Sequence, residues 1–352
     1  MKNPYYIVAP RYARTSAGVR VLYKLCDQIN KAGGSAFIFL WPRSNYNVAC
    51  SPMDVAPFLT KKIAQYHYEN KLTPIVIYPE VFNITRFNPP IGVRYILNYN
   101  ELLFKNRPLD EDDYLLTYSK NLAIQIQNKT SKPNSTIFLP VSDPAFFRPP
   151  EENSIRSGAI FYAGKYKYHF GGTTFPITDG LPEITRDQPN SQSPEEIRKL
   201  FQTKELFYCY EDSALALEAM LCGCPVVFLP NKFFTETLAN KELAGLGYAW
   251  GMSPEDIHRA KESVHLVRVN YEKLQQDAAN RIAKFIDFTQ TLSLGKSYNI
   301  QFAINILKNP SLIEMIISYC QLVKDVIQEK GFIATIKTIV KRIFFLRWQI
   351  FS

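Results

Sequence analysis

The stretch from Tyr210 to Pro230, YEDSALALEAMLCGCPVVFLP, has the composition of a helix followed by a strand. The apolar run ELFYCY leads into it, SALALEAMLCG predicts a helix, and PVVFLP predicts the next strand. Strand, helix and strand in this order form the repeating unit of a parallel α/β sheet. In such sheets, ligands bind where the carboxyl ends of strands meet the starts of helices.

The same alternation extends outward in both directions over the 352 residues. YYIVAP, SAFIFLWP and PIVIYP predict strands in the first half, and AGVRVLYKLCDQINKAG has helical spacing. A Pro-rich connection ends at Pro149 and Pro150, after which GAIFYAG restarts the pattern. We therefore predict an α/β fold of two Rossmann-like domains facing a cleft, over residues 1–150 and 151–290. A helical extension with a basic amphipathic tail is expected over residues 291–352.

Charge and cysteine content narrow the class of protein. The net charge of +9 favours anionic partners, which include nucleotide phosphates, nucleic acid and acidic lipid. The six cysteines form no C-x-x-C pair, and no apolar leader opens the chain. These features predict a cytoplasmic protein with free thiols. The most apolar segment, GFIATIKTIVKRIFFLRWQIFS, is interrupted by four bases, so no membrane-spanning helix is expected.

The predicted helix within the opening stretch carries groups suited to a nucleotide. Backbone N–H groups at a helix start are unpaired and favour phosphate, and Ala214 and Leu215 occupy that start. Ser213 either caps the helix or donates its hydroxyl to a phosphate. Glu218 lies one turn further on, where a carboxylate can accept two hydrogen bonds from a ribose diol. The alternative is that Glu218 is a solvent-facing residue on a core helix.

The segment EAMLCGCPVV resembles the donor-site element of glycosyltransferases with the GT-B fold. It is most similar to the retaining group (family 4-like, glycosyl transferases group 1) of bacterial polysaccharide biosynthesis, whose pattern is roughly E-x7-E followed by A-M-x-x-G-x-P-V-V. Glu218 matches the second glutamate, Gly223 the glycine and Pro225 the start of the strand. The resemblance implies that Glu218 binds the ribose of the donor.

The chain departs from the family pattern at the first glutamate, because Tyr210 occupies that position. The nearest acids are Glu211 and Asp212. A shift of one residue in the loop would let either of them contact the donor sugar in a catalytic role. Alternatively, this chain lacks that role. The resemblance favours retention of anomeric configuration, and Tyr210 leaves the stereochemistry open.

A second segment, FYAGKYKY, follows the first predicted strand of the second half and provides Gly164, Lys165 and Lys167. In the family, a glycine and basic residues at this place neutralise the donor diphosphate as it leaves. Lysines at a strand end can do this without a metal, so Lys165 is also a catalytic candidate. The alternative is two solvated lysines on a loop. Arg186 is a further basic candidate.

The first half is expected to bind the acceptor. Ser16 and Gly18 follow the first predicted strand, where such enzymes place a glycine close to both sugars, and Glu80 follows another strand. The segment is no G-x-G-x-x-G, which disfavours dinucleotide binding. The acidic run at residues 110–113 is interpreted as a solvated turn. We expect no cofactor and no metal.

The resemblance therefore implies transfer of a hexose from a nucleotide-sugar donor to a glycan or lipid-linked glycan. The expected setting is bacterial surface polysaccharide biosynthesis, such as lipopolysaccharide, O-antigen or capsule, without nucleic acid as a partner. The basic, aromatic tail fits peripheral binding at the cytoplasmic face of the membrane, although a helix docked on the core is the alternative. Two other functions stay open: a nucleotide-sugar epimerase of the same architecture, and a catalytically degenerate binding subunit.

Overall fold

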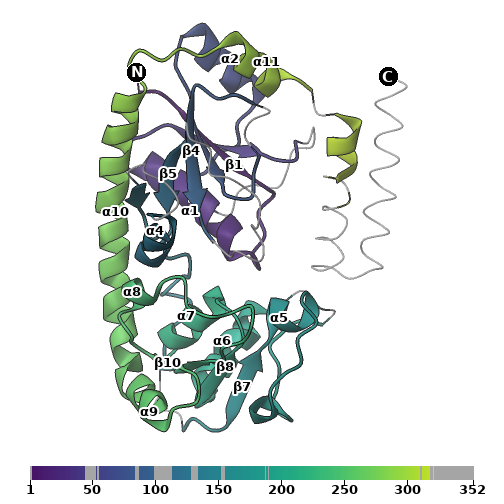
Figure 1. The fold of residues 1–352 in the computed structure, drawn as a ribbon, viewed down its shortest axis with the longest axis vertical. Coiled ribbons are helices and arrows are strands. Elements are labelled where there is room, and N and C mark those ends of the chain that lie inside the picture. The colour runs from purple at the N-terminus through teal and green to yellow at the C-terminus, as the bar shows by residue number, and fades with distance from the viewer. Residues whose placement is uncertain are drawn as a thin grey trace.

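The computed structural model describes residues 2–43, 53, 55–83, 87–98, 113–127, 134–151, 155–186, 188, 190–309, 311–317 and 320. It contains two parallel sheets, one from each half of the chain, as Figure 1 shows. The predicted fold class of two parallel α/β domains is thus confirmed. The basic tail after residue 320 lies outside the described residues. Among the helices that the structure describes, none is both long and apolar enough to cross a bilayer.

The first domain is built on a six-stranded sheet with the order β2-β1-β3-β4-β5-β6. Its strands are β1 (Tyr5–Ala9), β2 (Ala36–Leu40), β3 (Ile75–Pro79), β4 (Ile91–Ile96), β5 (Tyr114–Thr117) and β6 (Asn134–Thr136). Phe58 adds a parallel bridge to Ile38 on the outer side of β2. The strand order therefore reverses between β1 and β3, which is the switch point of a Rossmann-like sheet.

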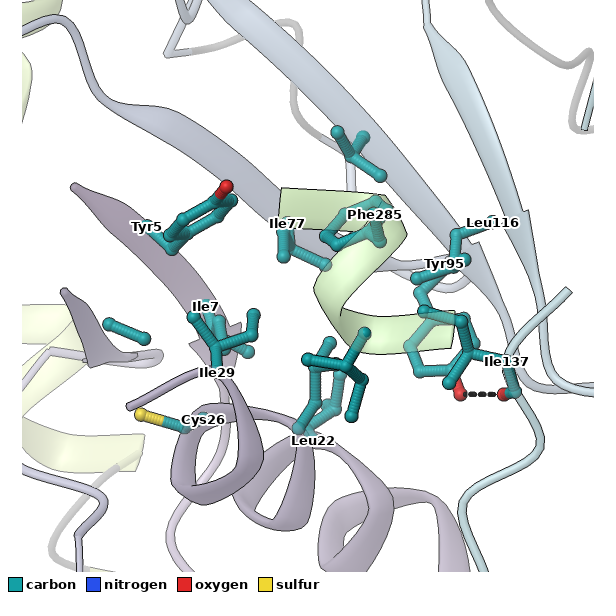
Figure 2. Close-up of a cluster of buried hydrophobic side chains, with 14 of the residues drawn as sticks. Tyr5, Ile7, Leu22, Cys26, Ile29, Ile77, Tyr95, Leu116, Ile137 and Phe285 are labelled. Carbon is teal, nitrogen blue, oxygen red and sulfur yellow. Dashed lines mark hydrogen bonds between the residues drawn. The ribbon is translucent and has the colours of Figure 1, made fainter. Parts of the chain in front are cut away.

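The helices described within this half of the chain are α1 (Ala17–Lys31), α2 (Lys61–Glu69) and α4 (Lys120–Gln127). Ser16 caps α1 by accepting a hydrogen bond from the amide of Val19. The apolar face of α1 includes Leu22 and Cys26, which lie against the β1 and β3 residues in the core drawn in Figure 2. This packing fixes the amino end of α1 at the carboxyl edge of the sheet.

The second domain has a four-stranded parallel sheet with the order β10-β9-β8-β7. Its strands are β7 (Ala159–Tyr162), β8 (Leu206–Cys209), β9 (Val226–Phe228) and β10 (Tyr248–Trp250). Glu183 forms a parallel bridge with Phe161 on the outer side of β7. The strand order thus reverses between β7 and β8, and ligands of such sheets bind at the carboxyl ends of these two strands.

The helices that the structure describes in the second domain lie between its strands and after β10. They are α5 (Gly164–Tyr168), η1 (Pro176–Thr178), α6 (Pro194–Thr203), α7 (Ala214–Leu221), α8 (Asn240–Leu243), α9 (Pro254–Ser263) and η2 (Val264–Leu266). A capping box precedes α6, because Ser193 and Glu196 each accept a hydrogen bond from the backbone of the other. Helix α7 lies within the predicted helical segment SALALEAMLCG, with Ser213 as its N-cap and Cys222 as its C-cap.

The long helix α10 (Val267–Leu292) joins the two domains and runs along the side of both (Figure 1). Tyr271, near its start, belongs to the core of the second domain. Phe285 and Ile286, near its end, belong to the core of the first domain (Figure 2). The hydroxyls of Tyr5 and Thr289 lie 2.7 Å apart. The chain thus returns to its first strand, and α11 (Ile300–Leu307) then packs against α2.

Candidate active site

The carboxyl edges of the two sheets face each other. At the start of α4 in the first domain, the amide of Lys120 donates to the carboxylate of Glu242 over 2.9 Å. The hydroxyl of Ser119 donates to the carbonyl of Leu238. Both partners lie in the segment between β9 and β10 of the second domain. The residues at these edges therefore occupy the contact between the domains, which is where ligands of parallel α/β sheets bind.

Glu218 lies on α7 at this contact and is buried, with 2% of its surface exposed. Its Oε1 accepts a hydrogen bond from Arg20 on α1 over 3.0 Å and lies 3.4 Å from the hydroxyl of Ser142. Its Oε2 lies 3.4 Å from Nη2 of Arg186. The alternative of a solvent-facing Glu218 is therefore wrong. Glu218, the residue predicted to bind the ribose, therefore lies between two arginines, one from each domain.

Arg186 is the residue that the sequence indicated only weakly. Its side chain is 7% exposed, and its Nη1 lies 3.5 Å from the carbonyl of Thr15 in the first domain. Its Nε is buried and has no hydrogen-bond partner among the described residues. Two guanidinium groups against the one carboxylate of Glu218 leave an excess of buried positive charge. Because buried polar groups are normally paired, this arrangement suits an anionic ligand.

Tyr210, which stands where the resemblance places a glutamate, belongs to the core of the second domain. It is fully buried, and its ring stacks on that of Tyr166 with centroids 5.2 Å apart. Its hydroxyl accepts a hydrogen bond from the amide of Phe175 over 2.7 Å and bonds with the hydroxyl of Thr178. Tyr210 therefore supports the sheet and does not face the contact between the domains.

The two neighbouring acids are both anchored to backbone amides. Glu211 accepts a hydrogen bond from the amide of Lys165 over 2.7 Å. Burial raises the pKa of Glu211, and the charge and amide of Lys165 oppose that rise. Asp212 is exposed and accepts a hydrogen bond from the amide of Leu238 over 2.6 Å. Glu211 is thus the acid that lies beside the predicted diphosphate lysine.

The three residues predicted to bind the diphosphate, Gly164, Lys165 and Lys167, take different positions. Gly164 has φ of 42°, and a Cβ there would lie 2.5 Å from the ring of Tyr162, so only glycine fits. Lys165 is exposed at the end of β7. Lys167 instead forms an ion pair with Glu183, which raises its pKa. Lys165 and Glu211 therefore meet at the switch point, whereas Lys167 reaches the outer edge of β7.

Ser213 caps α7, which is one of the two roles expected for it. Its hydroxyl oxygen accepts a hydrogen bond from the amide of Leu215 over 3.3 Å. The side chain of Leu215 is buried in the core of the second domain, and Ala214 is half-buried. The start of α7 lies at the carboxyl end of β8, next to Glu211. Its phosphate-binding role stays a prediction.

The predicted acceptor residues gather at the carboxyl edge of the first sheet. A Cβ on Gly18 would meet Leu97 at 3.6 Å, an ordinary contact, so the packing around Gly18 does not itself demand glycine. Glu80 is buried and accepts a hydrogen bond from the amide of Leu97 over 2.9 Å. Burial raises the pKa of Glu80 to about 7. Ser16 and Gly18 thus lie close to the segment that Glu80 holds.

No cluster of three or more His, Cys, Asp or Glu side chains able to hold a metal ion occurs in the described part of the chain. Asp113, which we expected in a solvated acidic turn, is instead buried and pairs with Arg94 over 2.9 Å. The expectation was wrong for Asp113 because β5 begins at the next residue, which draws the carboxylate into the sheet. Residues 110–112 lie outside the described residues.

No protein-family model matches the chain, and no curated protein matches its sequence. Similar solved structures include the glycosyltransferase SnogD from Streptomyces nogalater, at 11% identity and a TM-score of 0.42 over 83% of this chain and 100% of that one. The calicheamicin glycosyltransferase CalG4 is 13% identical, with a TM-score of 0.40 over 83% and 99%. Arabidopsis thaliana UGT89C1, solved with UDP, is 10% identical, with a TM-score of 0.45 over 82% and 100%. We assign the fold from the two parallel sheets of this chain itself.

Proposed function

We propose that the protein is a glycosyltransferase that moves a sugar from a nucleotide-sugar donor to a glycan or lipid-linked glycan acceptor. The observation that carries the proposal is the buried cluster of Arg20, Glu218 and Arg186 where the carboxyl edges of two parallel sheets meet. Lys165 lies at the neighbouring strand end and adds an exposed positive charge. A nucleoside diphosphate offers both the diol and the negative charge that these groups are suited to bind.

Each residue has a distinct part in the proposed reaction. The bond between the anomeric carbon and the diphosphate oxygen breaks as the acceptor oxygen bonds to that carbon, so negative charge grows on the diphosphate. The departing diphosphate oxygen then takes the proton of the acceptor hydroxyl. Lys165 and Arg186 stabilise that charge, and the amides at the start of α7 add donors. Glu218 holds the ribose, and Glu211 or Asp212 positions the donor sugar. No metal is required in this scheme, and retention of configuration is the proposed outcome.

The acceptor is proposed to lie against the first domain. Ser16 and Gly18 stand at the start of α1, and Glu80 holds the neighbouring segment at Leu97. The surrounding packing would accept a side chain at position 18, so it does not explain the glycine. We propose that Gly18 instead leaves its backbone accessible to a sugar. Transfer would then occur across the contact between the two domains.

The test of the donor site is calorimetry with a panel of nucleoside diphosphates on the full chain. The Lys165→Ala and Glu218→Ala variants are expected to lose binding at least tenfold, since each removes a charged contact of about 1.5 to 3 kcal/mol. Lys199→Ala, which removes an exposed lysine from α6, is the matched control and should bind as the wild type does. Unchanged binding in the Lys165 and Glu218 variants would refute the assignment.

We also propose a role in bacterial surface polysaccharide biosynthesis at the cytoplasmic face of the membrane. Residues 291–352 carry eight Lys or Arg and three Asp or Glu, so they contribute +5 of the net charge of +9. Within the described part of this segment, large apolar side chains are exposed at Leu294, Ile300, Ile304, Leu312, Ile313, Ile316 and Ile317. Exposed apolar groups next to basic ones suit an anionic lipid surface.

A catalytically degenerate binding subunit is the second candidate, and the core position of Tyr210 favours it. Such a subunit would bind the nucleotide sugar without turning it over. Donor consumption measured with and without a panel of lipid-linked glycans separates the two. A transferase consumes donor only when an acceptor is present, and a binding subunit consumes none in either case.

A further inference from the structure

We infer that Arg20 is a positioning residue that couples donor binding to separation of the two domains. In this view, the ion pair between Arg20 and Glu218 is a latch that the ribose of the donor must open. The inference rests on the proposed function, because it takes Glu218 as the ribose ligand. It adds a role for Arg20 in the first domain, which the family resemblance does not imply.

The latch is built from four separate parts of the chain. Arg20, on α1, donates through Nη1 to Glu218 on α7 over 3.0 Å and through Nη2 to the carbonyl of Val141 over 2.8 Å. The hydroxyl of Ser142 lies 3.4 Å from the same carboxylate oxygen, and Tyr271 on α10 donates to the Ser142 carbonyl. The guanidinium of Arg20 is therefore fixed on two sides.

The paired state and the donor-bound state exclude each other. In the paired state, Arg20 from the first domain occupies the side of Glu218 at Oε1, over 3.0 Å. Glu218 is almost completely buried, so a ribose cannot reach it in the paired arrangement. Because Arg20 belongs to the first domain and Glu218 to the second, exposing the carboxylate requires α1 to move away from α7.

Arg186 is expected to behave differently from Arg20. It belongs to the same domain as Glu218, and its Nε already lacks a partner among the described residues. When the domains separate, Arg186 moves with Glu218 and keeps the carboxylate paired, so Glu218 is not left as an isolated buried charge. Its contact with the carbonyl of Thr15 is long, at 3.5 Å, and is lost at little cost.

A latch of this kind lowers the apparent affinity for the donor, because binding must first populate the open state. Removing Arg20 should remove that penalty. Coupling between two sites in one protein typically changes affinity about 5- to 150-fold. We therefore expect Arg20→Gln to bind nucleoside diphosphates at least about fivefold more tightly than the wild type. A residue with a purely structural role would leave the affinity unchanged or weaken it.

The experiment is calorimetry with nucleoside diphosphates on the full chain and three variants. Arg20→Gln should show the increase in affinity, and Arg20→Lys, which keeps the charge but loses the second hydrogen bond, should lie between it and the wild type. The control is Arg43→Gln, which breaks a comparable pair with Glu314 (3.1 Å) that also joins distant parts of the chain. Its affinity should match the wild type.

Hydrogen exchange at the start of α1 provides a second readout. In the wild type, saturating nucleotide is expected to raise exchange there, and in Arg20→Gln the raised exchange should already be present without nucleotide. The coupling is refuted if both Arg20 variants bind no more tightly than the wild type while Glu218→Ala still weakens binding at least tenfold. If the wild type binds no nucleoside diphosphate at all, the proposed function fails first and the inference fails with it.

Discussion

Tyr210 shows how a single residue changes the interpretation of a motif. Tyr210 directly follows β8, and its side chain lies in the core, where it stacks on Tyr166 and bonds with Phe175 and Thr178. The family glutamate is therefore not merely absent here, since the position faces away from the domain contact. Any equivalent of its role must come from Glu211 or Asp212.

Restoring the family glutamate should damage the protein. Tyr210→Glu places a carboxylate in an aromatic core without a cationic partner, so we expect it to lower the free energy of unfolding by about 4 kcal/mol or more. Urea denaturation followed by circular dichroism measures this. Tyr210→Phe, the matched control, should cost about 1 to 3 kcal/mol, since only the hydroxyl is lost. A stable Tyr210→Glu variant with tighter nucleotide binding would contradict the core assignment.

Glu80 makes stability depend on pH. Its folded pKa of about 7 lies above the ordinary value of 4.5, so the folded chain holds this proton more tightly than the unfolded chain does. Stability contributed by the protonated form is complete below pH 4.5 and is lost as pH rises through 7. Relative to Glu80→Gln, the wild type should lose up to about 3 kcal/mol over that interval.

Denaturant titrations of both proteins at pH 4.5 and pH 7.5 measure this difference. The Gln variant keeps a carbonyl oxygen that can accept the amide of Leu97, so it serves as the neutral reference. A constant difference between the two proteins across the interval would show that the carboxyl of Glu80 is not perturbed by burial.

Contacts between single residues are the part of the site that sequence reasoning could not supply. Glu218 was predicted from a local motif, but its pairing with Arg20 joins residues 198 positions apart. Periodicity and capping patterns act over a few residues, so they carry no information on such a pair. The burial of Arg186 depends in the same way on how the two domains meet.

At the scale of helices and strands, the sequence was most informative where local physics decides. The segments SPEE and SPED each place a serine three residues before an acid, which predicts helix caps at Ser193 and Ser253, and both hydroxyls accept the corresponding amides. The apolar segment STIFLP is an exception: its composition favours a strand, but β6 ends at Thr136 and Ile137 already lies beyond the strand. The carbonyl of Ile137 instead accepts a hydrogen bond from Tyr95, which ties this exit segment to the core.

Helix α10 offers a test of how the two domains are held together. Phe285 is 5% exposed in the core of the first domain, whereas Phe288, three residues later, is 43% exposed. Phe285→Ala should therefore cost about 3 to 5 kcal/mol of unfolding free energy, because it leaves a cavity. Phe288→Ala should stay within about 1 kcal/mol of the wild type. Equal losses in the two variants would mean that α10 does not pack as described.

For the whole molecule, the two-domain organisation followed from the sequence because the strand and helix pattern restarts after a Pro-rich break. The individual contacts that hold the two carboxyl edges together, such as Lys120 with Glu242, did not, because they join residues far apart in the chain. The function of the tail belongs to this scale too, since it depends on the charge of an entire segment.

Binding to lipid vesicles tests the proposed membrane contact. The full chain should sediment with vesicles that contain anionic phospholipid and stay in solution with neutral vesicles, because the terminal segment is basic. Reversing two charges with Lys341→Glu and Arg342→Glu should reduce the bound fraction, at about 1 kcal/mol for each lost contact. Lys261→Glu together with Lys204→Glu, elsewhere in the second domain, is the control with the same net charge. Equal loss in both pairs would indicate a non-specific charge effect.

The return of α10 to the first strand also sets the order in which the chain can fold during synthesis. Tyr5 lies in the first strand, yet its hydroxyl partner, Thr289, and the covering ring of Phe285 are made some 280 residues later. Until the ribosome has released α10, the face of the first sheet that α1 and α10 share lacks part of its cover. We therefore expect the amino-terminal half to stay protease-sensitive on the ribosome until most of the chain has emerged, and both domains to complete folding together.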